Sequence, residues 1–141
     1  MHFEIKYGKN LPKELKNIFK KAIDKYSEII PTWCHVIYVK HEEPDEDGSP
    51  AHIVVQEKYR EATITLSTTI LSEEPKERID RIILHELIHI AIDPLATVAQ
   101  KIINKAIEND KLKVWAEGQL EEKEEAVIQD LLRIFKKYPP S

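Results

Sequence analysis

Two histidines and one glutamate, spaced as in a metal site, lie inside an otherwise apolar stretch of the sequence. The stretch reads Arg81-Ile82-Ile83-Leu84-His85-Glu86-Leu87-Ile88-His89-Ile90-Ala91-Ile92. Residues four apart on a helix share a face, so the imidazoles of His85 and His89 can bind one zinc ion. Glu86 lies about 100° around the helix from His85, which places its carboxylate beside that ion, where it can act as a base on bound water.

The residues around this motif predict a helix from about Pro75 to Ile92. Ser72 is a candidate cap, and Pro75 suits a first helical turn. Asp93 precedes Pro94, and a residue before proline disfavours the helical region, so we expect the helix to end there. Buried apolar helices seldom carry histidine and glutamate unless these side chains are paired or bind a metal. Hydrogen-bonded core histidines are the alternative to a metal site.

A catalytic zinc ion takes three protein ligands and leaves one position to water, so the motif needs a third ligand. No histidine follows the motif, because the other four are His2, His35, His41 and His52. The metzincin pattern would need glycine and histidine at the positions of Ile92 and Leu95, which excludes that class. We therefore expect the third ligand to be a carboxylate that follows the motif.

Candidate carboxylates occur in an amphipathic helix predicted over residues 119–135. Its apolar stripe consists of Leu120, Val127, Ile128, Leu131, Ile134 and Phe135. Glu124 falls near the centre of this stripe, and a carboxylate that faces a core needs a partner such as a metal, so Glu124 is the expected ligand. Glu125, about a quarter-turn away, and Glu121 are alternatives, as is Asp93, one turn after the motif. Such acidic residues can also stay solvated in a first helical turn, and Asp93 can instead cap a helix.

Three features together, the His-Glu-Leu-Ile-His motif, the alternating strand before it and a Glu-Glu-x-Val-Ile-x-x-Leu-Leu helix, resemble a minimal gluzincin. Gluzincins belong to the zincin-like metallopeptidase clan, and the chain is similar in size to small phage- and archaeal-type zincin domains. The resemblance covers about the second half of the chain, and only the first motif is specific. It implies that His85, His89 and Glu124 (or Glu125) bind zinc and that Glu86 is the general base in peptide-bond hydrolysis.

The sequence departs from the larger gluzincins, because it lacks an Asn-Glu-x-x-Ser-Asp helix and a downstream histidine that could steady the oxyanion. Turnover would need an oxyanion donor besides zinc. Side chains of a suitable type are Tyr59, Arg60, His52 and Tyr138, and nothing in the sequence places them at the motif. The alternative function is a zinc-binding but catalytically inactive domain that acts as a protein-interaction or regulatory module. A structural domain without metal is a third hypothesis.

The whole chain is expected to form one zincin-like metallopeptidase domain over residues 1–141, with an α+β fold. We expect a small three- to four-stranded mixed sheet, an N-terminal helix, the motif helix and two further C-terminal helices. The predicted helices span residues 11–30, 75–92, 95–108 and 119–135, and the predicted strands span 3–5, 35–39, 53–56 and 62–67.

Two finer expectations follow for these elements. Residues 58–61 would form the turn of a hairpin, and the strand after it would form the sheet edge, where its exposed Thr63 and Thr65 could border a bound peptide. In the helix over 95–108, the apolar residues Val98, Ile102, Ile103, Ala106 and Ile107 would pack on one face.

Composition restricts the class of partner. The chain has 141 residues, 42% of them apolar, a net charge of −4 and a single cysteine, Cys34. The mixed charge argues against nucleic acid, so we expect a peptide or protein substrate.

Without an evident leader or an apolar run of about 18 residues, we expect a cytoplasmic protein that does not contact a membrane. Cys34 is expected to be buried filler, and the richness in Lys, Glu and Ile is compatible with a thermophile.

Overall fold

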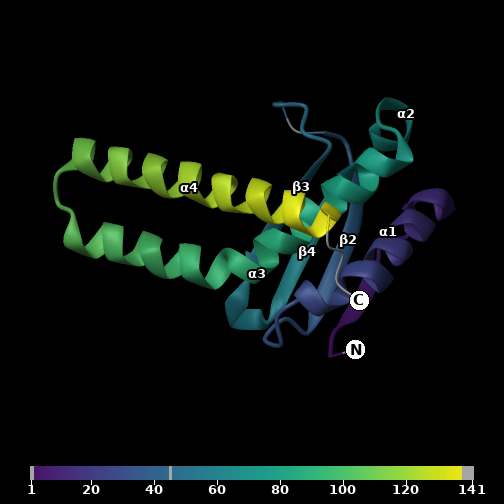
Figure 1. Cartoon of the computed structure of the whole chain (residues 1–141), viewed down its shortest axis with the longest axis horizontal. Helices are drawn as coiled ribbons and strands as arrows, with labels where there is room; N and C mark the ends of the chain where they lie inside the picture. The colour runs from purple at the N-terminus through teal and green to yellow at the C-terminus, as the bar shows by residue number, and fades with distance from the viewer. Residues whose placement is uncertain (1, 45, 138–141) are drawn as a thin grey trace.

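The computed structural model describes residues 2–44 and 46–137 and has an α+β fold, as predicted. In chain order its elements are β1 (Glu4–Tyr7), α1 (Lys13–Tyr26), β2 (Val36–Glu42), β3 (Ala51–Gln56), β4 (Glu61–Ser67), α2 (Ile70–Glu73), α3 (Lys76–Ala106) and α4 (Asp110–Lys137). Short 3-10 turns follow α1 at Ser27–Ile29 and β3 at Glu57–Tyr59. The sheet lies beside α1, and α3 and α4 extend from it side by side as a long hairpin (Figure 1).

The four strands form one mixed sheet in the order β1-β2-β4-β3. β1, β2 and β4 are parallel, whereas β3 runs antiparallel to β4 and forms one edge. The prediction that the strand over residues 62–67 forms the edge was therefore wrong, and Thr65 is only 6% exposed. The reason is the hairpin, which turns β4 back between β2 and β3 and leaves β3 on the outside.

The predicted hairpin between β3 and β4 is confirmed, with Val54 paired to Thr63. Its turn has no glycine, and Arg60 takes the left-handed conformation with φ 56° instead. The Arg60 amide donates a hydrogen bond to the Glu57 carbonyl at 3.0 Å, and the Arg60 carbonyl accepts one from the His35 amide at 2.8 Å. These bonds offset the steric cost that a side chain pays in this conformation.

The core lies against one face of the sheet. Alternate residues of β2 and β4 are fully or almost fully buried there, namely Ile37, Val39, Ala62, Ile64 and Leu66. α1 and the first half of α3 contact each other and contribute to the same cluster the residues Leu15, Phe19, Ala22, Ile23, Ile79, Ile83, Leu87 and Ile90. This packing fixes the half of α3 that carries the motif.

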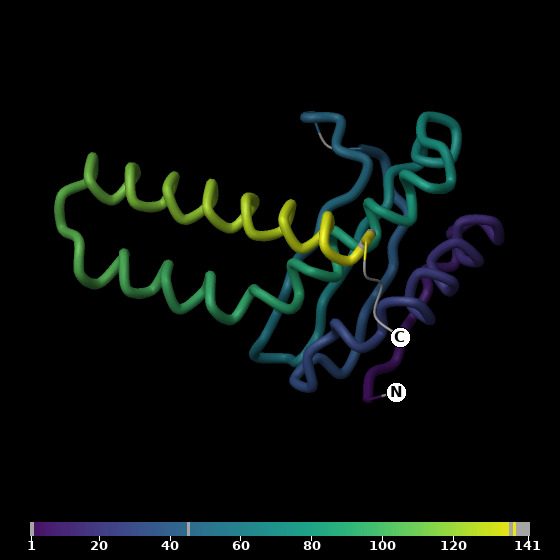
Figure 2. The backbone as a smooth tube through the Cα atoms, in the orientation of Figure 1, coloured from purple at the N-terminus to yellow at the C-terminus, as the bar shows by residue number. Residues whose placement is uncertain are grey.

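The prediction of a helix end at Asp93 was wrong. α3 continues through Pro94 to Ala106, so the two helices expected over residues 75–92 and 95–108 are one element. Proline inside a helix removes one backbone hydrogen bond and costs about 3 kcal/mol. Packing outweighs that cost here, because α4 contacts α3 on both sides of the proline, at His89 and at Gln100. The two helices lie side by side in Figure 2. Asp93 consequently caps no helix.

The apolar residues beyond the core are distributed differently from the prediction. Val98 and Ile102 on α3 are 53% and 60% exposed rather than packed. On α4, Ile128 is buried, whereas Val127 and Ile134 are about half exposed.

Among the described residues, α3 is the one helix long and apolar enough to cross a membrane, by length and composition alone. A core helix passes the same test, and the motif half of α3 is such a helix.

Candidate metal centre

Both motif histidines and one glutamate of α4 converge at the place where α4 crosses α3. The rings of His85 and His89 lie 4.8 Å apart between centroids, at 80° to one another. Glu125 Oε2 lies 3.3 Å from Nε2 of His85, and Glu125 Oε1 lies 3.2 Å from Nε2 of His89. One donor atom from each of the three side chains lies within 4.8 Å of the others.

These distances fit a zinc ion. In a tetrahedral site with bonds of about 2.0–2.1 Å, two ligand atoms lie about 3.3–3.4 Å apart. The separations from the two Glu125 oxygens, each to the Nε2 atom of a different histidine, are 3.2 and 3.3 Å. Two imidazoles and one carboxylate also match the donor set of catalytic zinc sites, which leave the fourth position to water. The three residues are candidate ligands, and since their donor atoms lie within 4.8 Å of one another, side-chain rotations would have to bring them to the tetrahedral spacing.

Glu124, the ligand expected from the sequence, takes a different place. Its Oε1 lies 3.3 Å from Nδ1 of His89, and it does not belong to the group of three. The expected stripe on α4 included Val127 and Ile134, which are half exposed, and omitted Leu132, which is buried. Burial does not favour Glu125, because 46% of its side chain is exposed against 23% for Glu124. Its contact with both Nε2 atoms distinguishes Glu125, the alternative that the sequence left open.

Glu86 is buried next to the group, with 5% exposure. Its Oε1 lies 3.2 Å from Nδ1 of His85, on the side of the ring opposite Glu125. This hydrogen bond is the largest cause of the raised pKa of His85; burial opposes it, and Glu125 adds to it. Glu86 thus orients the His85 ring and favours a proton on Nδ1, which leaves Nε2 available for a metal.

Asp93 lies one turn after His89 but outside the group of three. Burial raises the pKa of Asp93, the hydrogen bond donated by Thr97 Oγ1 at 3.3 Å opposes this, and the charges of Glu57 and Glu124 raise it further. An acidic side chain with acidic neighbours makes the surroundings of the group strongly negative. This environment favours a bound cation.

Two open cavities lie along α3 on the C-terminal side of His89, and Asp93 and Thr97 line both. The first, of about 340 Å³, is formed by α3 and α4 and includes Glu117, Glu121 and Glu124. The second, of about 660 Å³, lies between α3 and the end of the edge strand β3 and is lined by Val55, Gln56, Glu57, Lys58, Tyr59, Asp93, Thr97 and Lys101. An edge strand beside such a cavity offers backbone hydrogen bonds to an extended chain.

Of the side chains considered as oxyanion donors, only Tyr59 lines one of these two cavities. Arg60 Nη1 instead contacts Nε2 of His35 at 3.3 Å. His52 lies within β3 and lines neither cavity. Tyr138 lies outside the described residues.

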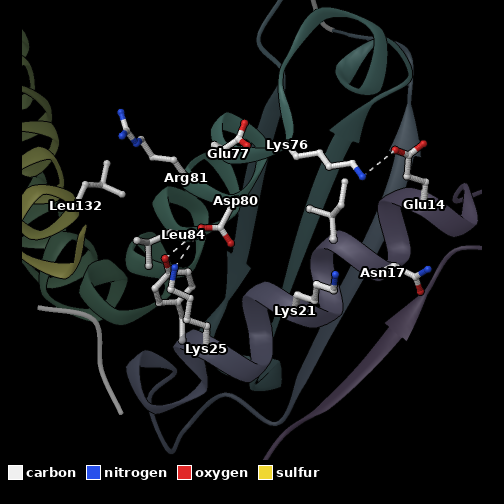
Figure 3. Close-up of a pocket in the computed structure, with 12 residues that line it drawn as sticks. Glu14, Asn17, Lys21, Lys25, Lys76, Glu77, Asp80, Arg81, Leu84 and Leu132 are labelled. Atoms are coloured by element: carbon white, nitrogen blue, oxygen red, sulfur yellow. Dashed lines mark hydrogen bonds and ion pairs between the residues drawn. The ribbon is translucent and has the colours of Figure 1, made fainter. Parts of the chain in front are cut away.

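A third cavity, of about 580 Å³, lies between α1 and α3 and carries no comparable chemistry (Figure 3). Two ion pairs connect its walls, since Lys76 lies 3.8 Å from Glu14 and Lys25 lies 3.8 Å from Asp80. Asp80 also accepts a hydrogen bond from the Tyr26 hydroxyl at 3.1 Å. These pairs tie α1 to α3 and thereby support the motif helix.

Residues 49–101 match the sequence model of the SprT-like family, a family related to zincin metallopeptidases. The matching segment contains β3, β4, α2 and the motif half of α3, but it covers less than half of the chain and ends before α4. No curated protein and no solved structure matches the chain significantly. The match, the motif and the mixed sheet together support a zincin-related α+β domain with a candidate metal site.

Proposed function

We propose that this chain is a zinc-dependent metallopeptidase whose zinc ligands are His85, His89 and Glu125. The observation that carries the proposal is the convergence of the two Nε2 atoms on the two oxygens of one carboxylate, at 3.3 and 3.2 Å. When bound there, zinc would supply a Lewis acid that polarises the attacking water and the scissile carbonyl. The SprT-like match supports the same class for the segment that holds the histidines.

Glu86 is proposed as the general base. It follows His85 directly, is buried at 5% exposure, and so can hold its carboxylate in a fixed place beside the group. A rotation of its side chain away from Nδ1 of His85 would turn it toward the water. Glu86 would then accept a proton from the attacking water and pass it to the leaving amine.

The substrate is proposed to be an extended segment of peptide or protein. β3 is an edge strand, and its last residues Val55 and Gln56 line the cavity of about 660 Å³ that adjoins α3. A peptide could add to this edge as a further strand, with its scissile bond directed toward the histidines. Tyr59 lines the same cavity, and its hydroxyl could donate a hydrogen bond to the substrate.

The test is zinc content and turnover of the Glu86→Gln variant. Purified wild-type protein should contain one zinc ion per chain by elemental analysis and should cleave an unfolded protein substrate. Glu86→Gln should keep the zinc and lose roughly 100-fold or more of the cleavage rate, because general-base catalysis contributes about that much. Glu122→Gln is the matched control, since it makes the same change at an exposed position of α4. A wild type without zinc, or an active Glu86→Gln, would refute the proposal.

A zinc-binding domain without catalysis is the second candidate. The observation that favours it is the contact between Glu86 and Nδ1 of His85 at 3.2 Å, which occupies the proposed base. In that case wild type and Glu86→Gln would both hold zinc, and neither would cleave unfolded substrates.

A further inference from the structure

Basic side chains are concentrated in and before the first helix. The first 26 residues contain seven lysines against three acidic residues, a net charge of +4. The remaining residues carry fourteen basic and twenty-two acidic side chains, a net charge of −8. α1 alone contains five of the lysines, namely Lys13, Lys16, Lys20, Lys21 and Lys25. The overall charge of −4 therefore hides a strongly basic segment.

The five lysines of α1 lie on the half of the helix that faces solvent. At about 100° per residue they fall within an arc of about 180°. The buried residues of α1 occupy the other half, namely Leu15, Phe19, Ala22, Ile23 and Tyr26. Lys16 is partly exposed and the other four lysines are exposed. We call these five lysines the basic surface.

Little of this positive charge is neutralised within the molecule. Lys25 lies 3.8 Å from Asp80. Glu14, one of the two acidic residues of α1, lies 3.8 Å from Lys76 of α3, which is a further cation. Among the residues that the structure describes, the other four lysines of the basic surface form no ion pair. The second acidic residue of α1, Asp24, is the remaining negative charge on this side of the helix.

Two of the unpaired lysines are held close to each other. The Nζ atoms of Lys16 and Lys20 lie 4.9 and 5.9 Å from the centre of the Tyr7 ring. Each ammonium group is attracted to the ring, but two like charges at one ring also repel each other. An anion bound at this place would relieve that repulsion. The basic surface is therefore arranged to contact an anionic partner.

We propose that the basic surface binds the anionic phospholipid surface of a membrane. Clusters of about four to eight lysines on an amphipathic helix are typical of such binding. The apolar side of α1 is packed in the core, so α1 does not insert into the lipid and the attraction is electrostatic. The sequence led us to expect no membrane contact, but that expectation considered leader and spanning segments and not the charge of one helix.

The shape of the molecule supports a contact through α1. In Figure 1, α1 lies at one end and the α3–α4 hairpin extends toward the other. Residues 117–125 of α4 carry five glutamates and one lysine, and an anionic membrane repels such a stretch. With α1 on the lipid surface, this acidic stretch points away from it. The inference does not rest on the proposed peptidase activity.

The type of basic residue favours lipid over nucleic acid. The first 26 residues contain no arginine. Arginine forms paired hydrogen bonds to phosphate and guanine, and these are prominent in nucleic-acid recognition. Lysine acts as a point charge and suits a diffuse anionic layer, in which no fixed pattern of acceptors has to be matched.

The test is co-sedimentation of the full chain with vesicles of phosphatidylserine and phosphatidylcholine, compared with vesicles of phosphatidylcholine alone. Wild type should bind only the anionic vesicles, and the binding should be lost between about 50 mM and 500 mM salt because salt screens the charges. The double variant Lys13→Glu/Lys21→Glu should bind roughly tenfold or more weakly, since two attractive charges become repulsive.

Two further variants serve as controls. Lys105→Glu/Lys111→Glu makes the same change of charge at two exposed lysines of the hairpin and should bind nearly as well as wild type. Lys13→Arg/Lys21→Arg keeps the charge and should bind like wild type. Circular dichroism shows whether each variant is folded.

A wild type that does not sediment with anionic vesicles at low salt would overturn the proposal. Equal weakening by the two glutamate double variants would also overturn it, because the effect would then reflect overall charge. A DNA duplex is added to the vesicles in a separate arm. If it removes the protein at a phosphate concentration below that of the anionic lipid, the preferred partner is nucleic acid and the assignment to lipid is wrong.

Discussion

Glu124 lies behind the His89 ring, with its Oε1 3.3 Å from Nδ1. The next residue, Glu125, lies 3.2 Å from Nε2 on the other side of the same ring. Consecutive glutamates of α4 therefore contact both nitrogens of one imidazole. A carboxylate on Nδ1 fixes the tautomer and leaves the Nε2 lone pair for a metal. We therefore propose different parts for the two glutamates, with Glu125 as a metal ligand and Glu124 as the residue that positions His89.

Glu125→Ala and Glu124→Ala should differ in their effect on zinc binding. Loss of Glu125 removes a proposed zinc ligand. Loss of Glu124 removes only the hydrogen bond to Nδ1 of His89 and should lower the affinity for zinc by about 10- to 100-fold. We expect the larger loss for Glu125→Ala. Competition with a chromogenic chelator measures both, and Glu122→Ala is the exposed control. The reverse order would show that Glu124 is the ligand.

Zinc affinity should fall as the pH is lowered through the pKa of His85. That pKa is raised in the folded protein, first by the hydrogen bond with Glu86. The protonated ring therefore stabilises the metal-free fold below the unfolded-state pKa of about 6.5, and this stabilisation is lost as the pH rises through the higher folded-state value. Zinc needs the neutral ring and competes with that proton.

The check is a set of zinc titrations between about pH 5 and 8. Glu86→Gln weakens the main cause of the shift, so in this variant zinc binding should persist to lower pH than in wild type. An affinity that does not change with pH would contradict the expectation.

Cys34 should be unreactive in the native protein. The residue is fully buried, and burial raises the pKa of its thiol to about 11. Compared with an exposed thiol, the thiolate fraction at neutral pH falls by about two orders of magnitude. Alkylation by iodoacetamide should therefore be slow in the folded protein and fast in denaturant. Rapid labelling without denaturant would show that the strand region around Cys34 opens readily.

Pro94→Ala should stabilise the fold. Pro94 lies inside α3, and alanine would restore a backbone hydrogen bond and remove a steric clash. Part of the gain is offset because proline also restricts the unfolded chain. We expect the free energy of unfolding in urea to rise by about 1–2 kcal/mol, with zinc content unchanged. A lower stability would mean that the packing of α4 on α3 requires a bend at this position.

Local geometry made much of the site predictable. His85, Glu86 and His89 lie within little more than one helical turn, so their relative placement follows from helix dimensions alone. The alternation of Ile64 and Leu66 with Thr63 and Thr65 likewise identified β4 as a strand, although Thr65 on its other face is buried too. The mixed sheet and the α+β class followed from such patterns.

The sequence alone determined the spacing of the two histidines and of the glutamate between them, and it led us to expect a third ligand from a distant segment. Only the tertiary structure decided that Glu125 meets both Nε2 atoms, that α3 passes through Pro94, and that β3 rather than β4 is the edge. Each of these depends on contacts between segments far apart in the chain. One residue of rotation on α4 exchanges Glu124 for Glu125, and packing between helices is strong enough to override a local helix-ending signal.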